Sequence, residues 1–313
     1  MKIVRLSELT LNDSMDFLKL PAICFNMNLT LEKFKKMKEM DPALKKGEGF
    51  YAIVDNRVVG QVVALVFDWR SKEGIQTVGG IGGVCVNPEY ARRGISKKLF
   101  VEAHKFLKSK NIDLVFLGTS KSFVAYGLYE QFGYKDFDPQ VLGFKFLKKS
   151  KKKRSGLKIV PYKKSMQKEL YNIWEKQASK GYGPTRPENF IEISLGHGMN
   201  NKEIKVFKGD GNLVGFARVD ERKDATVIEE ITAVSKRYWP LIIDEVEHNA
   251  KSNLAIIDVD HLLRPTIEKK GYNINKHYGV FMAKSFSGIS INRIKRLFGV
   301  NDNKFAFSSM DCF

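Results

Sequence analysis

The segment ARRGIS, residues 91–96, combines two arginines and a glycine at the predicted start of a helix. Apolar residues follow at helical spacing from Ile95 onward, so Arg92, Arg93 and Gly94 stand just before the first turn. The first N–H groups of a helix lack partners within it and lie at the positive end of its dipole, so they bind phosphate. Glycine also lets the backbone approach an anion closely. The segment therefore predicts a phosphate-binding turn.

The preceding segment, GGIGGVCVNP at 79–88, has four glycines in a stretch that otherwise predicts a strand. Strand interiors usually avoid glycine, because it packs no side chain and loses the most backbone entropy on folding. A bare strand that leads into a phosphate-binding turn suits an extended ligand lying along the strand edge. The expected ligand is long and thin, with a diphosphate at one end. The glycine spacing is neither GxGxxG nor GxxxxGK[ST], which disfavours a dinucleotide fold and a P-loop.

Apolar patterning predicts the elements that position these two segments in the first half of the chain. A hairpin with its turn at Asp55-Asn56 comes first. The expected elements after the glycine-bearing strand are a helix over 95–110, an apolar strand over 112–118, a helix that ends before Gly133 and a strand over 141–147.

The second half repeats this order. A hairpin turns at 209–211 and is followed by a strand over 226–234, a helix over 239–251, a strand over 254–259, a short helix over 262–272 and a last strand over 278–286. The segments YEQFGY (129–134) and IEKKGY (267–272) occupy matching places. The chain is therefore interpreted as a diverged internal duplication. The predicted organisation is a first domain over 1–150, a basic linker over 148–156, a second domain over 157–287 and a tail over 288–313.

Composition limits the class of protein. The 313 residues carry a net charge of +18, and the excess of Lys and Arg is spread over both halves of the chain. A spread excess favours a solvated surface over a nucleic-acid-binding face. The longest apolar run, at 62–67, is too short to span a bilayer, and the N-terminus has no apolar segment typical of a secretory signal.

The cysteines and histidines suggest neither a metal site nor a disulfide framework. Cys24, Cys85 and Cys312 are far apart in the sequence and form no CxxC pair, so we expect no zinc, reduced thiols and a cytoplasmic location. The five histidines show no spacing typical of metal ligands. No metal cofactor is predicted.

Two segments resemble motifs of the GNAT superfamily of N-acetyltransferases. VCVNPEYARRGISKKL (84–99) resembles its acetyl-CoA-binding segment, V-x-V-x-P followed by [RQ]-x-x-G-x-[GA], and AYGLYEQFGY (125–134) resembles its second motif, A-x-x-L-Y-x-x-x-G-[FY]. The GGIGG lead-in, the repeated half and the C-terminal Phe313 are most similar to the enhanced-intracellular-survival (Eis) branch. That branch usually carries a further sterol-carrier-like domain, in whose place this chain has a short tail.

The resemblance implies an α/β fold with a mixed sheet (α+β) in two tandem GNAT-type domains, of which the second is degenerate. It implies that acetyl-CoA is the co-substrate. The strand residues expected to contact the coenzyme are Val84, Cys85 and Val86, and backbone groups of the two valines would pair with its pantetheine arm. The pyrophosphate would be bound by the N–H groups of Arg92, Arg93, Gly94, Ile95 and Ser96. The usual Arg or Gln at the start of the turn is Ala91 here, a place that Arg92 is expected to fill.

The resemblance also implies that Tyr129 protonates the coenzyme A thiolate as it leaves. This chemistry is reasonable, because the pKa values of a phenol and a thiol both lie above neutrality. The strand 77–86 contains no Asp or Glu that would act as the base. In the Eis branch the terminal carboxylate lies in the active site, which makes the carboxylate of Phe313 a candidate here, with Asp311 as a rival.

In the second half, SKRYWPL (235–241) has no glycine where the phosphate-binding turn should be, and Ile267 stands where Tyr129 would be. The second domain is therefore expected to shape the acceptor cleft without binding coenzyme A. The predicted activity is direct acetyl transfer to a primary amine of a small-molecule acceptor. The alternatives are a protein lysine or N-terminal acetyltransferase, and a non-catalytic acyl-CoA-binding or nucleic-acid-associated module.

Overall fold

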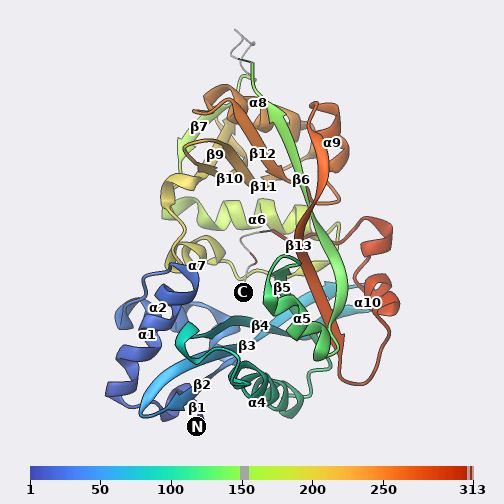
Figure 1. Cartoon of the computed structure of the whole chain (residues 1–313). Helices are drawn as coiled ribbons and strands as arrows, with labels where there is room; N and C mark the ends of the chain where they lie inside the picture. Colours follow the sequence, from blue (N-terminus) through green and yellow to red (C-terminus); the bar gives the residue numbers. More distant parts are fainter. Residues whose placement is uncertain (149–154, 309–310, 312–313) are drawn as a thin grey trace.

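A computed structural model describes residues 1–148, 155–308 and 311. Its strands form one sheet in the order β1-β2-β3-β4-β5-β13-β6-β12-β11-β10-β9-β7, with β8 paired to β3 beside this path. Figure 1 shows the two halves of the chain stacked along this sheet, the first half at the bottom and the second at the top. The predicted mixed α/β class is confirmed.

The first half begins with β1 (Lys2–Arg5), α1 (Leu11–Phe25), α2 (Leu31–Met40), α3 (Pro42–Lys46), β2 (Glu48–Val54), β3 (Arg57–Ser71) and β4 (Gly74–Val86). It continues with α4 (Ile95–Ser109), β5 (Leu114–Ser120), α5 (Val124–Gln131) and β6 (Lys135–Phe146). The two faces of β3 pack against different helices: Val62 and Ala64 lie in the cluster that contains α4, whereas Val58, on the other side of a register shift against β2, packs with Phe17 of α1. The helices α1 and α4 therefore cover opposite faces of the sheet.

The second half contains β7 (Lys158–Pro161), α6 (Gln167–Ala178), β8 (Gly183–Pro184), α7 (Phe190–Gly196), β9 (Ile204–Gly209), β10 (Asn212–Glu221) and β11 (Thr226–Ala233). After these come α8 (Trp239–Asn249), β12 (Leu254–Asp258), α9 (Arg264–Lys269), β13 (Asn273–Ser285) and α10 (Ile291–Leu297). Both predicted hairpins are confirmed. Their two-residue turns have positive φ at Asp55 and Asn56, and at Asp210 and Gly211, the conformation that hairpin turns favour.

The last strand of each half lies in the sheet of the other half. Strand β13 pairs with β5 on one side and β6 on the other, and β6 also pairs with β12. The pairings β5–β13 and β12–β6 are both antiparallel, while β4–β5 and β11–β12 are both parallel. The arrangement is thus similar on the two sides of the β6–β13 pair, and neither half completes its sheet alone.

The C-terminal segment packs against the first half. Phe298 and Phe305 are buried beside Trp69 and Phe116. Residue Phe305 also bridges to Tyr182. The tail is therefore docked as far as residue 308. Most of the predicted linker, residues 149–154, lies outside the described residues.

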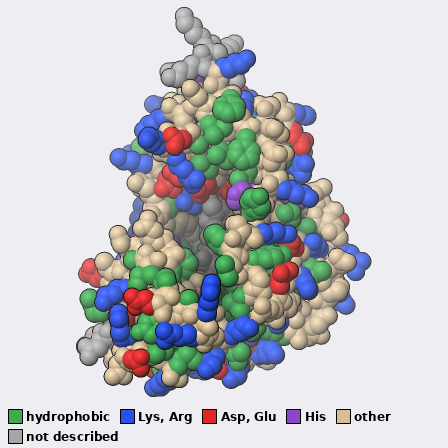
Figure 2. Space-filling view, viewed as in Figure 1, with side chains coloured by type: hydrophobic (Ala, Val, Ile, Leu, Met, Phe, Trp, Pro, Cys, Tyr) green, Lys and Arg blue, Asp and Glu red, His purple; other side chains and the backbone are tan. Residues whose placement is uncertain are grey.

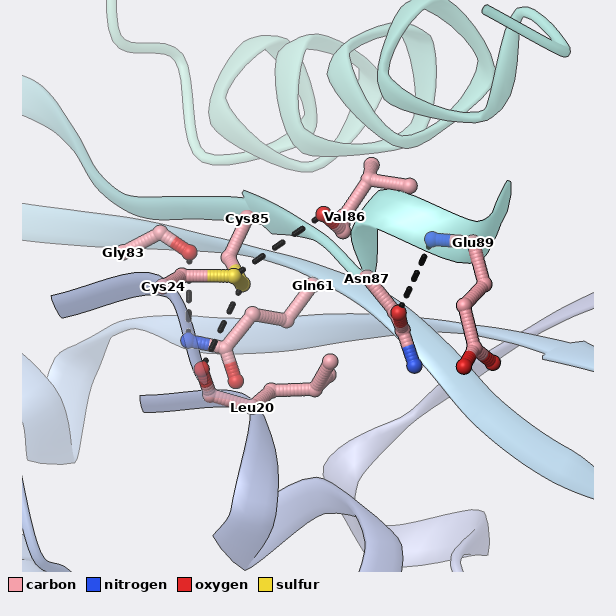
Figure 3. The surroundings of a disulfide bond; sticks show 8 residues. All are labelled: Leu20, Cys24, Gln61, Gly83, Cys85, Val86, Asn87 and Glu89. Atoms are coloured by element: carbon pink, nitrogen blue, oxygen red, sulfur yellow. Dashed lines mark hydrogen bonds between the residues drawn. A yellow bond between two sulfur atoms is a disulfide. The ribbon is translucent and has the colours of Figure 1, made fainter. Parts of the chain in front are cut away.

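Cys24 and Cys85 form a disulfide, which corrects the expectation of reduced thiols (Figure 3). Helix α1 crosses the face of β4, and this packing brings the two Cα atoms within 6.1 Å although 61 residues separate them. A pair so distant in sequence has no local signature, so spacing alone could not reveal it. The prediction of a cytoplasmic location depended on reduced cysteines, so the disulfide removes its basis. In the described part of the chain, the helices are too short or too polar to cross a membrane.

Candidate active site

The predicted phosphate-binding turn lies at the N-terminus of α4. Gly94 is the N-cap residue with φ +71°, and Arg92 has φ +61°. An added Cβ on Gly94 would meet no atom within 4 Å, so the space above the helix end is open. The turn from residue 91 to 94 is exposed, and the N–H groups of 92–96 donate to no described residue. The turn therefore presents a row of unpartnered N–H groups to solvent.

The two arginines of this turn differ in their contacts. Arg93 Nη2 donates a hydrogen bond to Glu89 O over 3.2 Å, and its guanidinium lies 5.0 Å from the centroid of the Tyr90 ring. Arg92 is exposed and has no hydrogen bond or ion pair with a described residue. The side chain of Arg93 is turned back onto η2 (Pro88–Tyr90), which leaves Arg92 as the more available cation.

Strand β4 carries a bulge at the glycines. Gln61 pairs with Cys85 and Val63 with Gly82, so two residues of β4 stand opposite one of β3. Gly83 has φ +56° at this place, a conformation that favours glycine, and Gln61 Nε2 donates to Gly83 O over 3.1 Å (Figure 3). A bulge takes backbone groups out of the regular ladder and redirects them. This explains why the strand contains glycine here.

Strands β4 and β5 separate just beyond the glycines. They are parallel and pair at Gly79–Val115 and Gly80–Phe116. Beyond these positions the described residues of the two strands no longer pair with each other. Residues 81–86 of β4 and 117–120 of β5 therefore line the two sides of a wedge. Strand β4 ends at Val86 and is followed by η2 and the turn at 91–94, so a ligand that extends along β4 in this direction has its far end near that turn.

Tyr129 lies in the last turn of α5 and is 6% exposed. It packs against Phe100, with 5.5 Å between ring centroids, and its hydroxyl has no hydrogen bond with a described residue. Burial raises the pKa of Tyr129 to about 12. The neighbouring Tyr134 hydroxyl instead lies 2.9 Å from His104 Nε2. Tyr129 is therefore a neutral phenol held in place by packing and free to donate its proton.

Four of the predicted site residues meet in one hydrophobic cluster. Tyr129 and Ile95 are buried members of it, and Val84 and Val86 pack against it. Cys85 faces the other way, toward α1, and its sulfur is bonded to Cys24. Any role of Cys85 toward a ligand in the wedge is therefore limited to its backbone.

The second half keeps the helices without the functional residues. Helix α8 follows η5 (Lys236–Tyr238), and its N-cap is Tyr238 with φ −86°, not a glycine. Ile267 is fully buried in α9 four residues before Gly271, as Tyr129 stands four residues before Gly133. Both glycines have positive φ, at +79° and +85°. Both helices are therefore followed by a glycine with positive φ.

A large cavity, which the sequence did not predict, lies on the face of the sheet opposite α4. It has a volume of about 860 Å³ and is lined by β3, the β4 bulge at Gly82 and Gly83, helices α1 to α3, and α7 and residues 184–187 of the second half. Figure 2 shows the surface hollowed where the two halves meet. Gly82 and Gly83 therefore belong both to the cavity wall and to the part of β4 that borders the wedge.

A smaller cavity of about 250 Å³ joins the end of β5 to the second half. Gly118 and Thr119 line it together with Asp258 and Asp260. Burial, with the nearby Glu229 carboxylate, raises the pKa of Asp258 to about 6, and burial raises that of Asp260 to about 6. Sequence analysis missed these carboxylates, because only the strand exchange places them beside β5.

The tail reaches the wall of the large cavity at Asp311. Arg186 Nε donates to Asp311 Oδ1 over 2.6 Å, and Arg186 also pairs with Glu230 over 2.9 Å. Asp311 is therefore held in an ion pair with Arg186 at the cavity wall. Phe313, the predicted source of a terminal carboxylate, lies outside the described residues. No set of three or more His, Cys, Asp or Glu side chains within the described ranges is arranged to hold a metal ion.

Residues 5–136 match the family model of the acetyltransferase (GNAT) domain. The chain carries a GNAT acetyltransferase domain. The wedge, the turn at Gly94 and Tyr129 all lie within this domain. Among curated proteins, none is similar enough to count as a relative.

Solved structures resemble the chain far beyond the GNAT domain. A conserved protein of unknown function from Enterococcus faecalis V583, described as a probable N-acyltransferase, superposes with a TM-score of 0.67 at 16% identity over 91% of this chain and 72% of its own. A GCN5-related N-acetyltransferase from Kribbella flavida gives 0.60 at 12% identity over 91% and 72%. A putative acetyltransferase from Pyrococcus horikoshii gives 0.51 at 18% over 90% and 89%. At these identities the likeness establishes the fold.

Proposed function

We propose that the protein is an acetyl-CoA-dependent N-acetyltransferase that transfers the acetyl group directly to a primary amine. The observation that carries this proposal is the wedge between β4 and β5, which ends at the unpartnered N–H groups of 92–96. A thin molecule with a diphosphate at one end fits this arrangement, and coenzyme A is such a molecule. The GNAT domain match over 5–136 supports the same co-substrate.

In the proposed mechanism the pantetheine arm lies along Val84 and Val86, and the thioester lies at the β4 bulge. Backbone donors near Gly83 polarise the thioester carbonyl. The amine nitrogen forms a bond to the carbonyl carbon, the carbon–sulfur bond breaks, and Tyr129 gives its proton to the departing thiolate. The pKa of Tyr129, raised to about 12, keeps this proton in place until the thiolate forms.

The proton that the amine loses needs an acceptor. We keep the terminal carboxylate of Phe313 as the first candidate, because the docked tail brings the chain to Asp311 at the cavity wall. Asp258 and Asp260 are the second candidates, because their pKa values of about 6 suit a base near neutrality. A free terminal carboxylate has a pKa of about 3.5, so it would need a dry site to act as a base.

We further propose that the second half is a degenerate GNAT-type unit that forms one wall of the acceptor cavity. Its helix α7 and residues 184–187 lie on that cavity, while its own helix start lacks the glycine turn. The similar strand arrangement of the two halves and the docked tail are the features that support a place in the Eis-like branch.

Release of the coenzyme A thiol from acetyl-CoA, measured across polyamines, aminoglycosides, amino acids and lysine peptides, tests the proposed function. We expect turnover with at least one class of amine. A peptide substrate preferred over all small amines would favour the protein acetyltransferase. Binding of acetyl-CoA without turnover of any amine would favour a non-catalytic acyl-CoA-binding module. Nucleic-acid binding that weakens steeply with salt would favour a nucleic-acid-associated module.

A further inference from the structure

The large cavity is long and begins at the proposed reaction centre. Gln61 and Gly83 line one end, and Asp68 of the same strand β3 lines it seven residues further on. At about 3.3 Å per strand residue this length is about 23 Å. Its volume of about 860 Å³ lies in the range of sites that hold a whole small molecule. An acceptor that fills this cavity must itself be elongated.

The walls of the cavity are mainly apolar, and both halves contribute to them. The apolar side chains come from α1, α2, α3, β3 and α7 and from Met199, three residues beyond α7; they include Phe17, Phe25, Phe34, Leu65, Phe190 and Ile193. An apolar wall favours an apolar ligand by about 25 cal/mol for each Å² removed from water. Its apolar side chains provide no hydrogen bonds or ion pairs to a ligand with many charges.

The charged side chains on the cavity wall lie next to partners of the wall itself, three pairs being Lys or Arg with a carboxylate and the fourth a His–Asp contact that is an ion pair only when the imidazole is protonated. Lys46 Nζ lies 3.1 Å from Asp68 Oδ2, and His197 Nε2 lies 2.9 Å from Asp41 Oδ2. The other two pairs are Arg218 with Glu229 at 2.9 Å and Arg186 with Asp311 at 2.6 Å. A polyamine or an aminoglycoside needs several carboxylates to replace its hydration. Each carboxylate here would first have to give up its present partner.

The acceptor, more than the acyl donor, has to use this cavity. Coenzyme A occupies the wedge on the side of α4, so the amine has to approach the thioester from the opposite face. That face is the cavity floor, formed by β3 and the β4 bulge. The chemistry of the cavity therefore selects the acceptor whatever acyl group the donor carries.

We infer that the acceptor is a lipophilic primary amine, one amino group on a long apolar body, and that the apolar body lies along β3 between α1–α3 and α7. This inference rests on the proposed acetyltransferase function and names its substrate class. The amino group lies at the Gly83 end, where the thioester is attacked. The apolar body extends toward Asp68 and Arg186.

Acetylation of butylamine, octylamine and dodecylamine tests the inference, with spermidine as the polycationic comparison and all amines below their micelle concentrations. Each alkylamine has the same amino group, so differences report on the chain. We expect kcat/KM to rise with chain length, by up to about fourfold per methylene, the factor that corresponds to about 0.8 kcal/mol per buried methylene. A flat series, or spermidine as the best substrate, would overturn the inference while leaving the acetyltransferase function intact.

Two substitutions at Ile193 of α7 locate the effect. Ile193→Glu places a carboxylate on the apolar wall and should remove most of the gain with chain length, and Ile193→Phe should move the optimum to a shorter amine. Ile75, which is 59% exposed on β4 and does not line the cavity, provides the matched controls Ile75→Glu and Ile75→Phe. These controls should behave like the unchanged protein.

Calorimetry with dodecylamine and with coenzyme A separates the possible failures. One outcome would assign the cavity to the acyl chain and overturn the inference. In that outcome dodecylamine binds without being acetylated, and butylamine is acetylated faster from a long acyl-CoA than from acetyl-CoA. Coenzyme A that fails to bind would reject the proposed function itself. Dodecylamine that fails to bind to a protein competent for coenzyme A would reject the inference alone.

Discussion

Arg186 and Asp311 form a buried ion pair that joins the C-terminal tail to the loop after β8. Arg186 Nε donates to Asp311 Oδ1 over 2.6 Å, and the two terminal nitrogens of Arg186 donate to Glu230 over 2.9 Å each. The guanidinium also lies 4.9 Å from the centroids of the Trp174 and Phe190 rings. Burial alone would lower the pKa of Arg186, but the two carboxylates raise it. One arginine thus connects the tail, β11 and α7 at the cavity wall.

Substitution of this arginine should be costly. Arg186→Met leaves Glu230 and Asp311 buried without their cation, so the free energy of unfolding should fall by about 3–5 kcal/mol. Urea denaturation measures this change. The control is Arg264→Met, which removes an exposed pair with Glu268 and should cost at most about 1 kcal/mol. Equal losses in the two variants would contradict a structural role for the buried network.

Tyr129→Phe should lower kcat by about 10²-fold, since it removes the proposed general acid, while acetyl-CoA affinity stays unchanged. The pKa of about 12 lies above the working range, so Tyr129 remains protonated and kcat should not fall between pH 8 and about 10 through its ionisation. Tyr126→Phe, in the same helix, is the control for loss of a phenol; Tyr126 donates to Asp136 instead. An unchanged kcat in Tyr129→Phe would make Tyr129 structural.

Gly94→Asp should abolish coenzyme A binding, because it places a carboxylate at the phosphate-binding turn. Gly74→Asp is a matched control: both glycines have positive φ, +71° and +97°, and an added Cβ meets no atom within 4 Å at either. The control should bind coenzyme A normally. Titration calorimetry should give one site per chain, since the start of α8 lacks the turn. Two sites, or a site that survives in Gly94→Asp, would refute the assignment.

Deletion of Phe313 and addition of one glycine after it test the terminal carboxylate. If that carboxylate accepts or relays the amine proton, both variants should lower kcat with little change in melting temperature or acetyl-CoA affinity. Kinetics and thermal melting of the two variants give both quantities. A glycine extension with full kcat would transfer the role to Asp258 or Asp260, and a lower melting temperature alone would assign the terminus to stability.

Loss of the disulfide should destabilise the protein. The bond closes a loop with a sequence separation of 61, and chain entropy gives about 4 kcal/mol for a loop of this size. Cys24→Ser should lower the melting temperature to that of the reduced protein, and reductant should then have no further effect. The number of reactive thiols should rise by two when the unchanged protein is reduced. A thiol count that reductant does not alter would show that the bond does not form.

Local signals in the sequence predicted the elements of the site well. The turn residues Asp55-Asn56 and Asp210-Gly211 fixed both hairpins, because few residues adopt positive φ there. Gly94 marked the start of α4 and Gly133 the end of α5. These features depend on neighbours in the chain, which the sequence displays directly.

Contacts between distant segments were decided by the tertiary structure. The disulfide of Cys24, the apolar cavity and the network of Arg186 each join segments more than 40 residues apart. The exchange of β6 and β13 places Asp258 and Asp260 next to β5, a proximity that no motif encodes. The sequence by itself determined the glycine turn at the start of α4, since that turn is built from consecutive residues. The packing of the two halves decided the shape and the apolar lining of the cavity proposed for the acceptor, because both halves contribute its walls.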